Sequence, residues 1–233
     1  MSVEGGSPEA GKRREIYTLH AVWRRGANWE TAVRGERERL ADEVAAALQS
    51  EPQLAVRGVY STVGFRPDAD ILFWLLAPDP ETLQRTVVAL RRTAFGRGCE
   101  MSWSFLGVAR PPEFVGDHLA AFQRGIEPKR YVQVYPFVRT PEWYLLPTEE
   151  RARLLREHGR LGAEFPQVYT NNVQAFGLGD YEWILSFETD DFSQFVDLIR
   201  RLREAEARRY TKLDVPFILG VRKPLVEALA DLD

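Results

Sequence analysis

Among the three histidines of this chain, His158 has the surroundings that most suggest chemistry. It lies in a predicted helix, residues 148–163, at spacings of three or four residues from Leu154, Leu155 and Leu161. These spacings place the imidazole on the apolar face of the helix, toward the sheet. Position alone favours a core histidine with one satisfied hydrogen bond. The alternative is an axial ligand to heme iron, with an acceptor for its other ring nitrogen.

A second group of candidates lies in the aromatic segment YVQVYPFVRTPEWY, which begins at Tyr131. Tyr135 is a candidate redox-active tyrosine beside a macrocycle, and Pro136 is expected to end regular strand pairing or to mark an edge. Arg139, four residues after Tyr135, is a candidate ligand for a carboxylate, which a planar guanidinium binds in bidentate fashion. The alternatives are aromatic packing for Tyr135 and a surface position for Arg139.

His118 lies in a linker that starts with two prolines, PPEFVGDHLAAF. A linker that crosses the mouth of a cavity can place a side chain in it, and an imidazole with a pKa near ~6.5 could deprotonate a peroxide there. The alternative is a solvated or helix-capping histidine. His20 lies on the first predicted strand, and no role is assigned to it.

The remaining sequence excludes several common kinds of site. It has no P-loop, GxSxG, HExxH or GxGxxG motif, and charged helix faces account for most carboxylates. The single cysteine, Cys99, excludes an intramolecular disulfide and an iron–sulfur cluster held by this chain alone, and it fits a reducing cytoplasm. A net charge of −3 gives no reason to expect binding to nucleic acid or to anionic membranes.

Hydrophobic periodicity predicts one supersecondary unit that occurs twice. Each half has the order β-α-β-β-α-β, which is typical of a ferredoxin-like repeat, and residues 59–83 parallel residues 173–195. Two such sheets could pack as a β-barrel with helices outside, so the predicted fold class is α+β. The predicted organisation is a disordered tail at 1–13, an N-terminal repeat at 14–110, a linker at 111–130 and a C-terminal repeat at 131–233.

The element boundaries follow from strand and helix periods. The predicted strands are 16–23, 55–65, 71–77, 99–108, 131–138, 168–177, 181–188 and 214–222. The predicted helices are 29–49, 79–95, 148–163 and 190–207.

Four features occur together in this chain: the duplicated plan, the YPF and WY segments, the helical histidine and the GLGDYEW hairpin. In this combination the chain resembles the chlorite dismutase-like family, over about residues 14–230. The resemblance implies two ferredoxin-like repeats in a dimeric α+β barrel-type fold. Within the family the chain is most similar to the branch that decarboxylates Fe-coproporphyrin III (coproheme), in the subtype with a distal histidine. Chlorite-degrading members carry a distal arginine after the proximal helix. Here no arginine occurs between Gln167 and Leu185, which argues against chlorite dismutation.

The resemblance also implies roles for single residues. His158 matches the axial iron ligand, Tyr135 matches the tyrosine that carries a radical, and His118 matches the distal base. The positions that line the macrocycle or hold its propionates are matched by Arg139, Trp143 and Trp183.

The implied activity is a hydrogen peroxide-dependent conversion of two propionates of coproheme to vinyl groups through a tyrosyl radical. Coproheme is then both substrate and redox centre, and heme b is the product. The alternatives are a general heme peroxidase, a non-catalytic heme carrier or sensor, and a cofactor-free ferredoxin-like oxygenase or binding module. The resemblance further implies a homopentamer, and it allows a transient contact with the ferrochelatase that supplies coproheme. The cysteine content and the net charge lead us to expect a cytoplasmic protein with no nucleic-acid or membrane partner.

Overall fold

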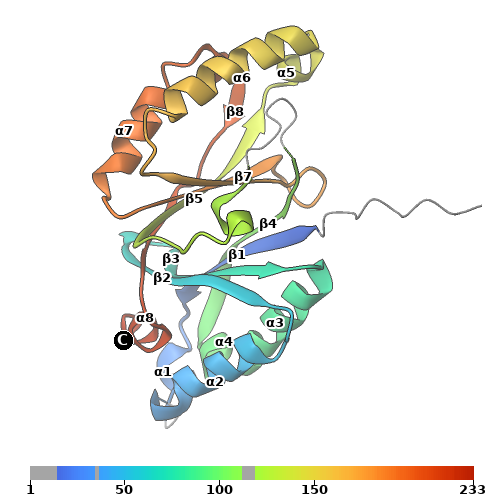
Figure 1. The fold of residues 1–233 in the computed structure, drawn as a ribbon. Helices are drawn as coiled ribbons and strands as arrows, with labels where there is room; N and C mark the ends of the chain where they lie inside the picture. The colour runs from blue at the N-terminus through green and yellow to red at the C-terminus, as the bar shows by residue number, and fades with distance from the viewer. Residues whose placement is uncertain (1–14, 35–36, 112–118) are drawn as a thin grey trace, which may run out of the picture.

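The computed structural model describes residues 15–34, 37–111 and 119–233 (Figure 1). The strands are β1 Ile16–Arg25, β2 Ala55–Arg66, β3 Ala69–Ala77, β4 Cys99–Ala109, β5 Tyr131–Arg139, β6 Tyr169–Gln174, β7 Trp183–Thr189, β8 Thr211–Leu213 and β9 Ile218–Arg222. The helices are α1 Trp29–Ala32, α2 Arg37–Gln49, α3 Pro80–Arg92, α4 Ala94–Gly98, α5 Pro141–Leu145, α6 Thr148–Gly162, α7 Ser193–Leu202 and α8 Leu225–Ala230, with short 3-10 turns η1 Ala121–Arg124 and η2 Glu206–Tyr210.

Both halves contain the predicted β-α-β-β-α-β order, and the α+β fold class is confirmed. One predicted helix is divided, and one predicted strand is shortened. The helix expected over 29–49 is two helices, α1 and α2, and Gly35, a poor helix former, lies between them in the sequence. The strand expected over 214–222 begins only at Ile218, because Pro216 has no N–H group to contribute to a ladder.

The strands form a closed barrel to which each half contributes four. The order is β7-β6-β4-β1-β3-β2-β9-β5, and antiparallel pairing between β5 and β7 closes the ring. The junctions between the halves are short: β4 pairs with β6 at Val108, and β2 pairs with β9 at Tyr60 and Ser61. Closure leaves the eight strands of the ring without a free edge.

Pro136 does not end β5, but regular pairing with β9 on one side of the strand stops before it, as one of the two expectations for Pro136 had it. The strand continues to Arg139, and Pro136 still lies opposite Ile184 of β7. On the other side of β5 the partner changes, from β9 up to Val134 to β8 from Val138 onward. Pro136 therefore lies between the stretch of β5 that pairs with β9 and the stretch that pairs with β8. Neither strand requires an N–H donor from residue 136 on that side.

Helices cover the two outer faces of the barrel unequally (Figure 1). Beneath α2, α3 and α4 the N-terminal half buries a dense core, with Trp23, Trp29, Phe73 and Phe95 almost completely inaccessible to solvent. On the C-terminal half, α6 and α7 cover a smaller core around Phe187, Phe195 and Leu198 and leave a cavity beside it. Across the described ranges, no helix is long and apolar enough to cross a membrane.

A buried ion pair joins the halves and the end of the linker. Arg57 of β2 and Glu188 of β7 approach to 2.9 Å, with side-chain exposures of 7% and 0%. Glu188 also accepts hydrogen bonds from the Asn171 side chain (3.0 Å) and the Lys129 main-chain N–H (2.9 Å), while Arg57 donates to the carbonyl of Ile126. Burial raises the pKa of Glu188 against the opposing influence of Arg57, so the carboxylate depends on this partner.

His20 lies inside the barrel and also connects the halves. One ring nitrogen is 3.0 Å from the Ser186 hydroxyl of β7, and the ring packs on Trp74 with centroids 4.6 Å apart. The side chain is fully buried, and burial lowers the pKa of His20 to about 3. His20 is therefore a neutral core histidine, which agrees with the absence of a predicted chemical role.

This buried histidine predicts a specific acid sensitivity. The folded pKa lies below the unfolded value of 6.5, so the unfolded chain binds the proton more readily between these values. Stability contributed by neutral His20 is complete above pH 6.5 and is lost as pH falls toward 3, at about 1.4 kcal/mol per pH unit. We expect His20→Gln to flatten that part of the curve, as measured by urea unfolding at a series of pH values. An unchanged slope in the variant would contradict the assignment.

Candidate functional site

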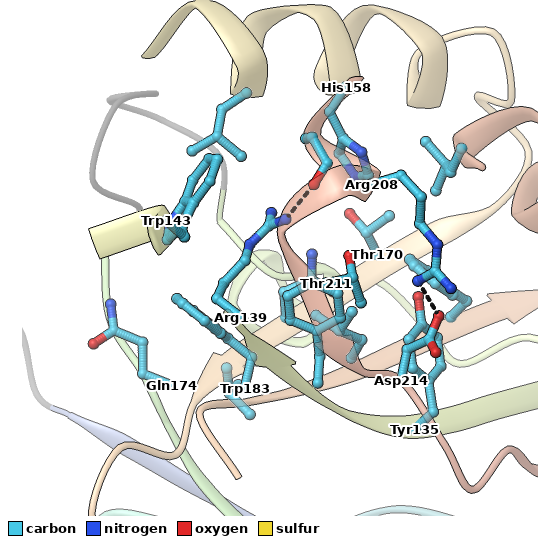
Figure 2. A pocket seen from close by; sticks show the side chains of 18 of the residues that line it. Tyr135, Arg139, Trp143, His158, Thr170, Gln174, Trp183, Arg208, Thr211 and Asp214 are labelled. Atoms are coloured by element: carbon cyan, nitrogen blue, oxygen red, sulfur yellow. Dashed lines mark hydrogen bonds and ion pairs between the residues drawn. The ribbon is translucent and has the colours of Figure 1, made fainter. Parts of the chain in front are cut away.

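The cavity lies between the outer face of the C-terminal half-barrel and the helices that cover it (Figure 2). Its volume is about 600 Å³, in the range of small-molecule and cofactor sites. Strands β5, β6 and β7 form one wall, and α5, α6, α7 and η2 contribute to the others. The charged, histidine, tyrosine and tryptophan side chains that line it include Tyr135, Arg139, Trp143, His158, Trp183, Arg203, Arg208 and Asp214.

Strand alternation explains which side chains reach the cavity. Along β5, Tyr135, Phe137 and Arg139 line it, whereas Val132 and Val134 pack inside the barrel. The same period of two applies to β6 and β7. The alternate residues that line the cavity are Thr170, Asn172 and Gln174 on β6, where Val173 also reaches it, and Trp183, Leu185 and Phe187 on β7.

His158 projects from α6 into the cavity, as the helical spacing predicted (Figure 2). Burial, together with the positive charge of Arg139, lowers the pKa of His158 to about 4. The imidazole is therefore neutral near pH 7, and a ring nitrogen has a free lone pair. Among the described residues neither ring nitrogen makes a hydrogen bond, so the expected acceptor is not found there.

The chemistry of the donor set limits what kind of metal centre is possible. The described part of the chain contains no group of three or more His, Cys, Asp or Glu side chains that could hold a metal ion. An ion bound through His158 would consequently need most of its ligands from another molecule. Porphyrin-bound iron has this property, since it requires only one or two axial ligands.

Arg139 presents a buried positive charge to the cavity. Only 9% of the residue is exposed, and burial lowers the pKa of Arg139 to about 10, so it stays charged at neutral pH. One guanidinium nitrogen donates to the carbonyl of Ala207 (2.9 Å), and the group lies over the ring of Trp143 at 4.2 Å. Its guanidinium forms no ion pair with any carboxylate of the described chain. A buried cation without a counter-ion is suited to bind an anionic ligand.

Tyr135 occupies the apolar part of the cavity wall. It is 6% exposed, and its ring packs against Phe217 and Phe187 with centroid separations of 4.5 and 5.9 Å. Burial raises the pKa of Tyr135, with a further contribution from the carboxylate of Asp214. The phenol is therefore protonated at neutral pH and has a hydrogen to give.

A second group of charges lies beside Tyr135 (Figure 2). The carboxylate of Asp214 forms ion pairs with Arg203 and with Arg208, the latter at 2.8 Å. Asp214 directly follows β8, whose pairing with the end of β5 brings it close to Tyr135. Neither Arg203 nor Asp214 is among the site residues predicted from the sequence, because a basic helix end is equally typical of a solvated surface.

The structure brings five of the six predicted site residues into one cavity: Tyr135, Arg139, Trp143, His158 and Trp183. Trp143 is buried between Arg139 and Tyr210, and Trp183 packs on Phe137 and Phe176. The sixth, His118, lies outside the described residues, and its role as a base stays a prediction.

Comparisons with known proteins agree with this architecture. A family model described as chlorite dismutase matches residues 37–223. A coproheme decarboxylase from Mycolicibacterium smegmatis is 46% identical over 200 residues, which cover 84% of this chain and 87% of that protein. A protein of Halobacterium salinarum whose name describes it as heme-binding is 30% identical over 87% of this chain and 49% of its own length.

A solved structure of a chlorite dismutase variant from Candidatus Nitrospira defluvii superposes with a TM-score of 0.84. The match covers 95% of this chain and 96% of that chain at 23% sequence identity. At this identity the similarity supports the fold alone.

Because the Arg139 guanidinium forms no ion pair within the described chain, we expect its replacement to change the free energy of unfolding. Replacing this buried cation with an apolar side chain in Arg139→Met removes its desolvation cost. We expect the ligand-free protein to become more stable by about 1–3 kcal/mol, measured by urea unfolding. Arg203→Met is the matched control, because it breaks an existing ion pair and should give no gain. A clear loss of stability in Arg139→Met would mean that Arg139 is mainly a structural residue.

Proposed function

Because this chain belongs to the chlorite dismutase family, we propose that it is a coproheme decarboxylase, which converts two propionates of Fe-coproporphyrin III to vinyl groups and so makes heme b. The observation that carries the proposal is a single cavity lined by His158, Tyr135 and Arg139. The enzyme is then an oxidoreductase-type heme synthase, and coproheme is both its substrate and its redox centre.

His158 suits the iron of this substrate. Its imidazole is neutral, it faces the cavity from a helix, and the porphyrin itself supplies the four equatorial nitrogens. The basic side chains suit the four carboxylates. Arg139 has no counter-ion in the part of the chain that the structure describes, and Arg203 with Arg208 adds a net positive charge beside Tyr135 even when Asp214 is counted. Trp143 and Trp183 provide flat apolar surfaces for the macrocycle.

The reaction needs an oxidant. Each propionate loses carbon dioxide, one proton and two electrons, and one hydrogen peroxide takes up two electrons and two protons to give two water molecules. Peroxide at the iron supplies the oxidising power.

Tyr135 is the group that passes this oxidation to the substrate. It loses one electron and its phenolic proton, and the tyrosyl radical takes a hydrogen atom from the β-carbon of a propionate. Loss of carbon dioxide and one further electron leaves the vinyl group. The buried and protonated phenol of Tyr135 is in the correct starting state for this step.

His118 is proposed as the base that accepts the proton of the peroxide, an assistance typically worth ~10²–10⁴ in rate. The wall contributed by β6 presents Thr170, Asn172 and Gln174, where a chlorite-degrading enzyme would be expected to carry an arginine. This difference favours decarboxylation over chlorite dismutation. We further propose a cytoplasmic homopentamer that receives coproheme through transient contact with a ferrochelatase.

Mass spectrometry of the porphyrin tests the proposal directly. When protein, Fe-coproporphyrin III and stepwise peroxide are mixed, we expect two successive losses from the porphyrin, each of one carbon dioxide and two hydrogen atoms. A porphyrin that stays bound but keeps its mass would indicate a heme peroxidase or carrier instead.

Tyr135→Phe tests the proposed radical residue. The variant should bind coproheme normally. Its rate of heme b formation should fall by at least about 10²-fold, because phenylalanine cannot provide the radical. Tyr169→Phe is the matched control, because Tyr169 lies on β6 without lining the cavity. Full turnover by Tyr135→Phe would exclude this role.

A further inference from the structure

Glu182 connects three segments that carry cavity side chains. Its Oε2 accepts a hydrogen bond from the main-chain N–H of Arg139 and another from the hydroxyl of Tyr144, both at 2.6 Å. Its own N–H donates to the carbonyl of Phe137 (3.2 Å), and its carbonyl accepts from the N–H of Ala175 (2.8 Å). A single residue thereby joins the end of β5, helix α5 and the loop between β6 and β7.

Each joined segment places an aromatic ring or a charge in the cavity. Helix α5 carries Trp143, which lies over the Arg139 guanidinium, and Trp183 follows Glu182 directly at the start of β7. Phe176 of the joined loop packs edge-on against Trp183 (4.6 Å) and Tyr144 (6.1 Å). The bond between Tyr144 and Glu182 therefore holds the two tryptophan-bearing segments together.

The Glu182 carboxylate binds the main chain of Arg139 and not its guanidinium group. The carboxylate contacts the main-chain N–H, so the guanidinium donors that do not bind the Ala207 carbonyl remain available for another anion. The negative charge is nevertheless close enough to favour the positive form of Arg139. This arrangement differs from that of Asp214, whose carboxylate takes donors from Arg203 and Arg208 directly.

We propose that Glu182 is a positioning residue, which through its two Oε2 hydrogen bonds holds Arg139 and Trp143 in place to receive a substrate carboxylate. The inference rests on the proposed function of Arg139 as the carboxylate receptor. Glu182 does not touch the substrate in this scheme, and its effect on binding passes through Arg139.

The test measures dissociation constants for Fe-coproporphyrin III, which has four carboxylates, by Soret titration. We expect Glu182→Ala to weaken binding about tenfold, which corresponds to about 1.4 kcal/mol. Glu182→Gln should stay within about threefold of the unmodified protein, since one amide oxygen can accept both hydrogen bonds. Glu100→Ala is the control, because it removes a carboxylate from an exposed ion pair with Arg24.

A double-mutant cycle separates positioning from general destabilisation. In an Arg139→Met background, adding Glu182→Ala should change the dissociation constant by less than about twofold. The proposal is overturned if Glu182→Ala keeps its full effect in that background, or if Glu182→Gln loses as much affinity as Glu182→Ala. Matched urea unfolding curves identify any variant that fails to fold.

The binding measurement remains informative if the proposed reaction fails. A protein that binds Fe-coproporphyrin III but leaves its mass unchanged would refute the decarboxylase function and still allow the cycle to be read. If Arg139→Met alone leaves affinity unchanged, Arg139 is not the receptor, and the role of Glu182 is excluded together with it.

Discussion

Pairing between β5 and β7 closes the barrel, and the direction of every cavity-facing strand residue depends on its register. Tyr135 lies opposite Leu185 and Phe137 opposite Trp183, so both strands present the same alternate set to the helices outside. A shift of one residue would turn Tyr135 and Arg139 into the barrel interior. The seams between the halves are much shorter than this ladder. The buried pair of Arg57 and Glu188 therefore supports closure where main-chain pairing is sparse.

The two repeats share a plan but differ in how completely their outer faces are filled. The N-terminal half buries several large aromatic side chains under its helices, whereas the C-terminal half keeps a cavity. That cavity also concentrates unfavourable features: a buried arginine that has no carboxylate partner within the described ranges, and a partly buried neutral histidine. Functional sites commonly accept such costs, which the well-packed half of the molecule can offset.

Local patterns were sufficient to predict part of the site. Helical spacing placed His158 on the correct face, because that face depends only on residues within two turns. Residue type and position made Arg139 a candidate carboxylate ligand, whereas assigning roles to Trp143 and Trp183 required the family resemblance. Contacts such as those of Glu182 with Tyr144, or of Asp214 with Arg203, could not be predicted, since each joins segments that meet only after the chain has folded. The last strand starts later than its hydrophobic run predicts, because Pro216 lacks the main-chain N–H that a strand ladder needs.

The cavity lies outside the closed ring of strands, between the sheet and the helices α6 and α7. The main-chain ladder that maintains the fold is therefore separate from most of the side chains that select a ligand. Substitutions on α6, α7 and η2 can change the shape of the cavity without disturbing the hydrogen bonds between the strands. The same barrel can therefore acquire a different ligand specificity through substitutions of cavity-lining side chains in the C-terminal half alone.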